Sequence, residues 1–111
     1  MNRREFTDNI TILVREMVED KEQPILDYIL RSAEEQRRLF DKGLSRCDGT
    51  TNKSNHQKGL AADIYLCESD VTEGVRVNYD WNRDKAKRWH DRWEELGGKP
   101  VIEWDLPHFE G

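Results

Sequence analysis

The sequence has few cysteines and prolines and lacks long apolar runs. Among 111 residues there are two cysteines and three prolines, and no apolar run approaches the roughly 20 residues that span a bilayer. Cys47 and Cys67 are too few for a disulfide framework and lack the C-x-x-C spacing of a structural zinc site. We expect reduced thiols, with a single bridge as the alternative. Residues 1–6 also lack the apolar core and cleavage site of a signal peptide. These absences predict synthesis in the cytoplasm and no membrane partner.

The chain also lacks a concentration of basic charge. Its formal net charge of −5 argues against nucleic acid as a partner, since a phosphate-binding surface needs clustered Lys and Arg. Basic residues instead alternate with acidic ones, as in Arg83-Asp84-Lys85 and Arg92-Trp93-Glu94, a pattern typical of a solvated helix face. His90 lies in this charged segment and is expected at the surface. The apolar residues are periodic, so one monomeric domain over 1–111 with a modest core is expected.

Hydrophobic periodicity predicts three helices. Apolar residues at helical spacing predict a helix over 3–20, and its acidic polar face suits core packing better than a lipid surface. A second helix begins after Ser32, which forms a capping box with Glu35, and it stops at Gly43. A third helix is expected over 82–96.

Four segments have the composition of strands. The segments 25–30 and 60–67 are short and apolar, 75–79 alternates and could pair with 60–67 as a hairpin, and 101–104 is the last expected strand. The polar segment 44–55 is a long loop, and loops longer than about 12 residues are more often functional than incidental. The mixed order of elements predicts an α+β domain, with a small antiparallel sheet flanked by helices.

Two short segments hold the residues with metal-binding chemistry. His56 ends the polar loop, Asp63 follows in the expected strand, and Asp105 and His108 lie near the end of the chain. Three protein ligands, an open position for water and a spare carboxylate are the parts of a catalytic zinc site. We therefore expect His56, Asp63 and His108 to bind Zn²⁺, with Asp105 as the general base. Each residue taken alone could have a structural role, such as a strand-end turn for Asp63. The presence of all of them together favours a zinc site.

The motif S-x-H-x-x-G-x-A-x-D, followed by a late D-x-x-H, is similar to that of the zinc D-Ala-D-Ala carboxypeptidase family. That family includes phage L-alanyl-D-glutamate endolysins and vancomycin-resistance D,D-peptidases, and it shares its fold with the hedgehog signalling domain. The first motif is matched in full by Ser54, His56, Gly59, Ala61 and Asp63. The closing segment 105–110 and the upstream segment 30–36, followed by Gly43-Leu44-Ser45, also resemble family patterns. The similarity covers about 25–111 and leaves the N-terminal helix, 1–22, outside it.

The resemblance implies a hedgehog/DD-peptidase-like fold and a zinc peptidase that acts on peptidoglycan stem peptides. The bond would be of the L-alanyl-D-glutamate or the D-Ala-D-Ala type. It also implies a phage or prophage endolysin, which reaches the cell wall after the membrane has been permeabilised. A zinc-stabilised binding module without catalysis, or an intracellular D-Ala-D-Ala dipeptidase, is the alternative.

The resemblance also implies roles for further residues. Arg31 would stabilise the developing oxyanion or hold a substrate carboxylate, and its alternative is a surface ion pair with a nearby glutamate. Ser54, Gln36 and Ser45 would contact substrate. Many relatives have Glu where this chain has Asp105, so Glu103, on the same face of the expected strand, is a competing base.

Overall fold

The computed structural model describes residues 1–27, 30–50, 53–66, 81 and 83–111. Its elements in chain order are α1 (Arg3–Glu19), β1 (Pro24–Leu26), α2 (Ala33–Asp41), β2 (Ala61–Leu66), α3 (Arg83–Glu95) and β3 (His108–Glu110). The strands form one antiparallel sheet in the order β1-β2-β3. The α+β class, the antiparallel sheet and the three expected helices are therefore confirmed.

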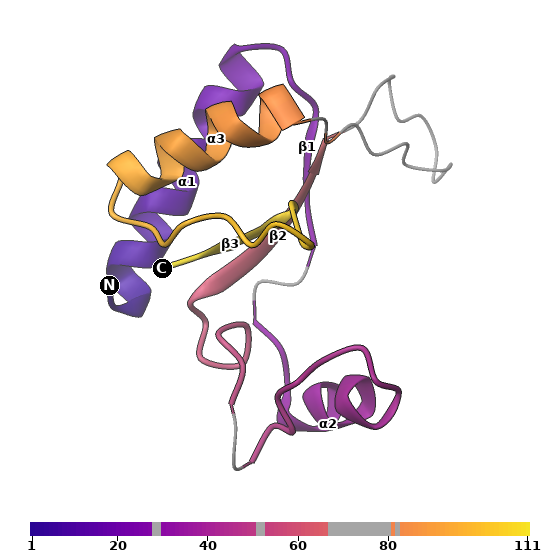
Figure 1. The fold of residues 1–111 in the computed structure, drawn as a ribbon. Coiled ribbons are helices and arrows are strands. Elements are labelled where there is room, and N and C mark those ends of the chain that lie inside the picture. The colour runs from indigo at the N-terminus through magenta and orange to yellow at the C-terminus, as the bar shows by residue number, and fades with distance from the viewer. Residues whose placement is uncertain (28–29, 51–52, 67–80, 82) are drawn as a thin grey trace, which may run out of the picture.

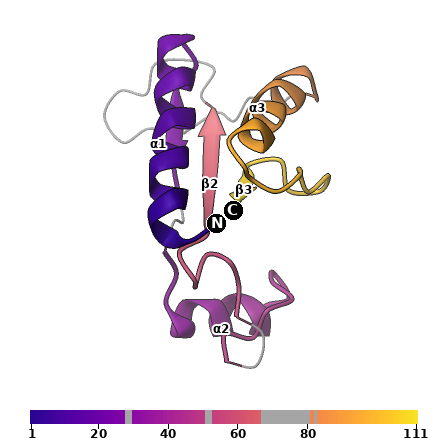
Figure 2. The same cartoon turned by 90° about the vertical axis from the view of Figure 1, so that its left-hand side faces the viewer.

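The helices take two different positions relative to the sheet. α1 and α3 contact each other, and β2 lies between them in Figure 2, whereas α2 stands apart at the opposite end of the molecule (Figures 1 and 2). The core lies between α1, α3 and the sheet, and consists of Phe6, Ile10, Leu13, Met17, Ala62, Ile64, Leu66, Trp89, Trp93 and Phe109. Helical spacing places the α1 members on one face, as the sequence predicts. Within the described residues, no helix is long and apolar enough to cross a bilayer.

Side-chain caps define where the first two helices begin. The side chain of Asn2 accepts a hydrogen bond from the backbone N–H of Glu5 at 2.8 Å. The hydroxyl of Ser32 accepts one from the N–H of Glu35 at 3.1 Å, so the predicted cap of α2 is confirmed. Each cap satisfies one of the donors that the first turn of a helix leaves unpaired.

The predicted strand over 101–104 is wrong. This segment forms turns instead, in which the N–H of Asp105 donates to the carbonyl of Ile102 at 2.9 Å. The last strand is β3, where Phe109 is buried against the core with 1% exposure, while Trp104 is 80% exposed. Burial of the Phe109 ring therefore determines which segment pairs with β2.

Two other strand predictions have different outcomes. β1 is shorter than the expected segment 25–30, because its described pairing covers only Pro24 to Leu26, opposite Leu66 to Ile64. The expected strand over 75–79 lies outside the described residues.

His90 is buried, which contradicts its expected place at the surface. Its side chain is 2% exposed, and its ring stacks on Phe109 with the centroids 4.0 Å apart and the planes 2° apart. Its Nε2 lies 2.7 Å from the carbonyl oxygen of Leu106. Burial lowers the pKa of His90, so the ring is neutral near pH 7. The spacing of His90 from the buried Ala86 and Trp93 is helical and was the better guide than its charged neighbours.

Candidate metal centre

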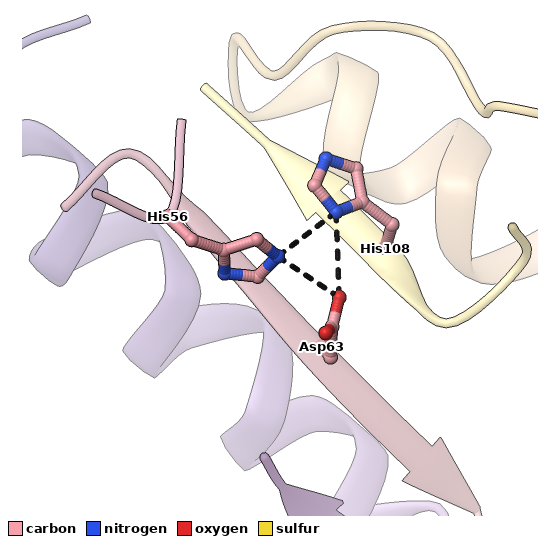
Figure 3. Close-up of side chains that lie close together, drawn as sticks. All are labelled: His56, Asp63 and His108. Atoms are coloured by element: carbon pink, nitrogen blue, oxygen red, sulfur yellow. Dashed lines mark hydrogen bonds and ion pairs between the residues drawn. The ribbon is translucent and has the colours of Figure 1, made fainter. Parts of the chain in front are cut away.

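His56, Asp63 and His108 come together in the structure (Figure 3). Nε2 of His56 lies 3.2 Å from Oδ1 of Asp63 and 3.2 Å from Nδ1 of His108. The third side of this triangle, from Nδ1 of His108 to Oδ1 of Asp63, measures 3.3 Å. One atom of each side chain therefore points at a common centre.

The pairing of β2 with β3 brings two of these residues together. Asp63 and His108 are direct partners in the antiparallel register, so their side chains leave the sheet on the same face. The N–H of Ile64 donates to the carbonyl of Pro107 at 2.9 Å and extends this pairing. The expectation that the end of the chain lies beside residues 60–66 is thus confirmed, although the strand itself starts later than predicted.

His56 reaches the centre from a tight turn before β2. The hydroxyl of Ser54 accepts from the N–H of Gln57 at 3.1 Å, and the N–H of Gly59 donates to the carbonyl of His56 at 3.2 Å. Gly59 has a φ of +72°, and a Cβ there would lie 2.6 Å from Nε of Arg3. Only glycine adopts this conformation in so little space. Ser54 is 8% exposed, and besides its bond in the turn it lines the cavity beside His56.

The three residues fit a zinc ion. Tetrahedral zinc with bonds of about 2.0–2.1 Å requires ligand atoms about 3.3 Å apart, which agrees with the sides of 3.2 to 3.3 Å. Two imidazole nitrogens and one carboxylate oxygen are a donor set of catalytic zinc sites, which keep a further position open. The group could therefore hold a metal ion, and its geometry suits zinc.

The charges of the three residues also suit a cation. Burial acts to raise the pKa of the Asp63 carboxyl, but hydrogen bonds from His108 and His56 outweigh it and hold this pKa well below its usual range. Burial acts to lower the pKa of His108, but its hydrogen bond and charge interaction with Asp63 outweigh burial and raise it. Asp63 is therefore ionised near pH 7, and an ion that binds there must displace any proton from His108.

Asp105 lies beside the three ligands, and Glu103 does not. Oδ2 of Asp105 is 4.0 Å from Nδ1 of His108, and both residues line the same cavity. Burial raises the pKa of the Asp105 carboxyl, which the neighbouring charges partly offset. Glu103 lines a different cavity with His90. The segment turns here, so the strand parity that made the two carboxylates equivalent does not apply.

A buried glutamine holds the side chain of Arg31, and the backbone of Arg31 bonds the turn that carries His56. Nη1 of Arg31 donates to Oε1 of Gln36 at 2.9 Å, and Nε2 of Gln36 donates to Oγ of Ser45 and to the carbonyl of Cys47, both at 2.7 Å. The backbone N–H of Arg31 also donates to the carbonyl of His56 at 3.1 Å. Gln36 is fully buried, so it holds Arg31 and the Ser45 loop in place instead of presenting its amide at the surface.

His56, His108, Asp105 and Arg31 border a cavity of about 690 Å³. Its basic lining residues are Arg31, Arg46, Lys53, Lys58 and Lys99. The acidic ones are Asp105 and Glu110. The lining is thus positive in a chain whose net charge is −5. The exposed side chains of Leu44 and Trp104 also border it, and the guanidinium of Arg46 lies 5.7 Å from the centre of the Trp104 ring.

Sequence reasoning missed the basic lining and the contacts of Glu110. Arg46, Lys53 and Lys58 lie between α2 and β2, whereas Arg31 precedes α2 and Lys99 follows α3, and the five share no motif. Glu110 lies two positions after His108, so strand alternation could have placed it on the same face. Comparison of the chain with protein-family models finds no match, and comparison with curated proteins finds no match either. Its function must therefore be argued from the site.

Proposed function

We propose that this protein is a zinc peptidase of the hedgehog/DD-peptidase fold, which hydrolyses a peptide bond in peptidoglycan stem peptides. The triangle of His56, Asp63 and His108, with Asp105 beside it in an open cleft, is the observation that carries this proposal. The resemblance of the surrounding motifs supplies the substrate class. It also supports a phage or prophage endolysin, which acts on the cell wall after the membrane has been permeabilised.

The zinc ion, when bound, would supply Lewis acidity and a water whose pKa falls to about 7. Asp105 would accept the proton of the attacking water and return it to the departing amine. Arg31, held by Gln36, offers a fixed cation at the same cleft, where negative charge develops on the carbonyl oxygen.

The cleft lining supports an anionic peptide as substrate. Stem peptides carry free carboxylates, and five of the lining residues are basic. Clefts of about 300–1,000 Å³ typically hold ligands of drug size, so a cavity of about 690 Å³ has room for more than a dipeptide. This supports cleavage within the polymer over the trimming of free D-Ala-D-Ala.

The test is digestion of purified peptidoglycan by zinc-loaded protein, with mass spectrometry of the soluble products. We expect new peptide termini that a chelator abolishes and that added zinc restores. The new termini identify the bond, and protein with His56→Ala is the matched control. Intact peptidoglycan, with zinc shown to be bound, would contradict the proposal and favour the binding module or the dipeptidase.

A further inference from the structure

Glu110 faces the metal centre from behind His108. It lies two residues after His108 in β3, so both side chains leave the strand on the same face. Nδ1 of His108 faces Asp63 and His56, and Oε2 of Glu110 lies 3.7 Å from the other ring nitrogen, Nε2. The carboxylate therefore meets His108 on the side turned away from the common centre.

The same carboxylate oxygen also contacts the turn that carries His56. Nδ2 of Asn55 donates a hydrogen bond to Oε2 of Glu110, and Asn55 directly precedes His56. One carboxylate thus joins two segments that lie 55 positions apart in the sequence. Each of these segments carries one of the two histidines of the centre.

The backbone of Glu110 is held by residues of the core. Its carbonyl accepts hydrogen bonds from Nε1 of Trp93 at 2.8 Å and from the N–H of Lys99 at 2.9 Å. It is also the register partner of the buried Ala61, and its side chain is only 16% exposed. Its backbone is therefore fixed before any ion binds.

We propose that Glu110 is a positioning residue of the metal centre, which orients His108 and anchors the His56 turn. This inference rests on the proposed zinc site. A carboxylate behind a metal-binding histidine keeps the proton on the remote ring nitrogen and leaves the lone pair of the other nitrogen to the metal. The separation of 3.7 Å exceeds a hydrogen bond, so the contact with His108 acts through charge. Loss of a hydrogen-bonded partner typically weakens metal binding by about 10–100-fold, and this longer contact should give the lower end of that range, about tenfold.

Two substitutions separate the two contacts. Glu110→Gln removes the charge behind His108 but keeps an amide oxygen that can accept from Asn55. Asn55→Ala removes the anchor of the turn and leaves the carboxylate behind His108. Glu19→Gln, at an exposed carboxylate paired with Arg15 on α1, is the matched control for the loss of one negative charge.

The measurement is the zinc dissociation constant of the full chain by competition with a chromophoric chelator, together with the melting temperature of the metal-free protein. We expect Glu110→Gln to weaken zinc binding about tenfold without lowering that melting temperature by more than a few degrees. Asn55→Ala should weaken zinc binding less. At saturating Co²⁺, Glu110→Gln should shift the visible absorption bands, whereas Asn55→Ala and Glu19→Gln should leave them in place.

The outcomes distinguish this inference from the proposed function. Zinc binding by Glu110→Gln within about threefold of the wild type, with unchanged cobalt bands, overturns the role of Glu110 and leaves the zinc peptidase standing. A wild-type protein that binds no zinc overturns both. Tight zinc binding with the expected loss in Glu110→Gln, but no hydrolysis, supports the positioning role and contradicts the peptidase.

Discussion

The two sides of the candidate site are held together by different forces. On the sheet side, Asp63 and His108 are placed by backbone pairing of β2 with β3, and the apolar core under α1 and α3 supports both strands. On the α2 side, Arg31 and Ser45 are placed by hydrogen bonds to the side chain of Gln36. Figure 1 shows α2 away from the rest of the molecule.

The two kinds of support predict different consequences of substitution. Apolar burial is strong and nondirectional, and it gives Asp63 and His108 a rigid support. A buried polar group is directional, and each unmade hydrogen bond is costly. Gln36 is the one buried residue of α2, and its amide oxygen accepts a hydrogen bond from the Arg31 side chain. We expect core substitutions to affect stability first, and substitutions at Gln36 to affect catalysis first.

Removal of one of the proposed zinc ligands should have the largest effect on hydrolysis. His56→Ala removes the turn ligand and Asp63→Ala the sheet ligand, and each should reduce peptidoglycan hydrolysis on the order of a thousandfold or more, because zinc activation of water is lost. The circular dichroism spectrum should stay close to that of the wild type. Undiminished hydrolysis by either variant would show that these residues are not the ligands.

Truncation of Phe109 tests the sheet side. Phe109 is 1% exposed and contacts His90 and Trp93, so Phe109→Ala should lower the free energy of unfolding by about 3–5 kcal/mol. Phe40→Ala on α2 is the matched control, since Phe40 is 38% exposed, and it should cost less than about 1 kcal/mol. Urea denaturation measures both, and equal losses would contradict the asymmetry between the two sides.

Removal of the Gln36 amide tests the α2 side. Gln36→Met keeps the volume but removes the hydrogen bonds to Arg31, Ser45 and the carbonyl of Cys47, which should cost about 1–3 kcal/mol. Because the Arg31 side chain loses this contact, hydrolysis per folded molecule should fall about 10–100-fold. Gln57→Met is the control, because the Gln57 amide bonds the carbonyl of Gly49 at 2.7 Å. Equal losses of activity in Gln36→Met and Gln57→Met would contradict a specific role of Gln36 in orienting Arg31.

The smallest expected effect is a pH dependence of the metal-free protein. The pKa of His108 is higher in the folded protein than its value of 6.5 in the unfolded chain. Protonated His108 therefore stabilises the fold at a pH below 6.5, and this contribution is lost as the pH rises through the pKa of the folded state. His90 acts in the opposite direction, because burial lowers its pKa. Wild type and His108→Asn both contain His90, so its contribution cancels when they are compared. The difference in their unfolding free energies should therefore be larger at about pH 5.5 than at about pH 8.

Zinc should reverse this dependence. A proton competes with the metal for Nδ1 of His108, so zinc-loaded protein should gain stability as the pH rises. Thermal unfolding with and without chelator at both pH values measures this. A difference between wild type and His108→Asn that does not change with pH would contradict the interaction of His108 with Asp63.

Much of the fold could be predicted, because its helices carry local signals. The apolar spacing of α1 and the cap at Ser32 are properties of short segments, and the structure confirms both. β3 was misplaced because Val101-Ile102 is the more apolar run, whereas pairing is decided by the burial of Phe109 against distant elements. No local pattern contains that information.

In the candidate site, too, features with a local sequence signal could be predicted and features that depend on distant contacts could not. The motif around His56 and Asp63 predicted three residues that do come together. The burial of Gln36 and the second contact of Glu110 depend on side chains brought in from other elements. Their partners are far apart in the sequence, and no spacing rule relates them.

The pairing of β2 with β3 has a consequence for the order of folding. Asp63 and His108 are 45 positions apart, and His56 and His108 are 52 apart, so the triangle cannot form until residues this far apart in the chain have met. Closing such loops costs entropy that only later contacts repay. A nascent chain on the ribosome therefore cannot complete the site before residue 108 has emerged.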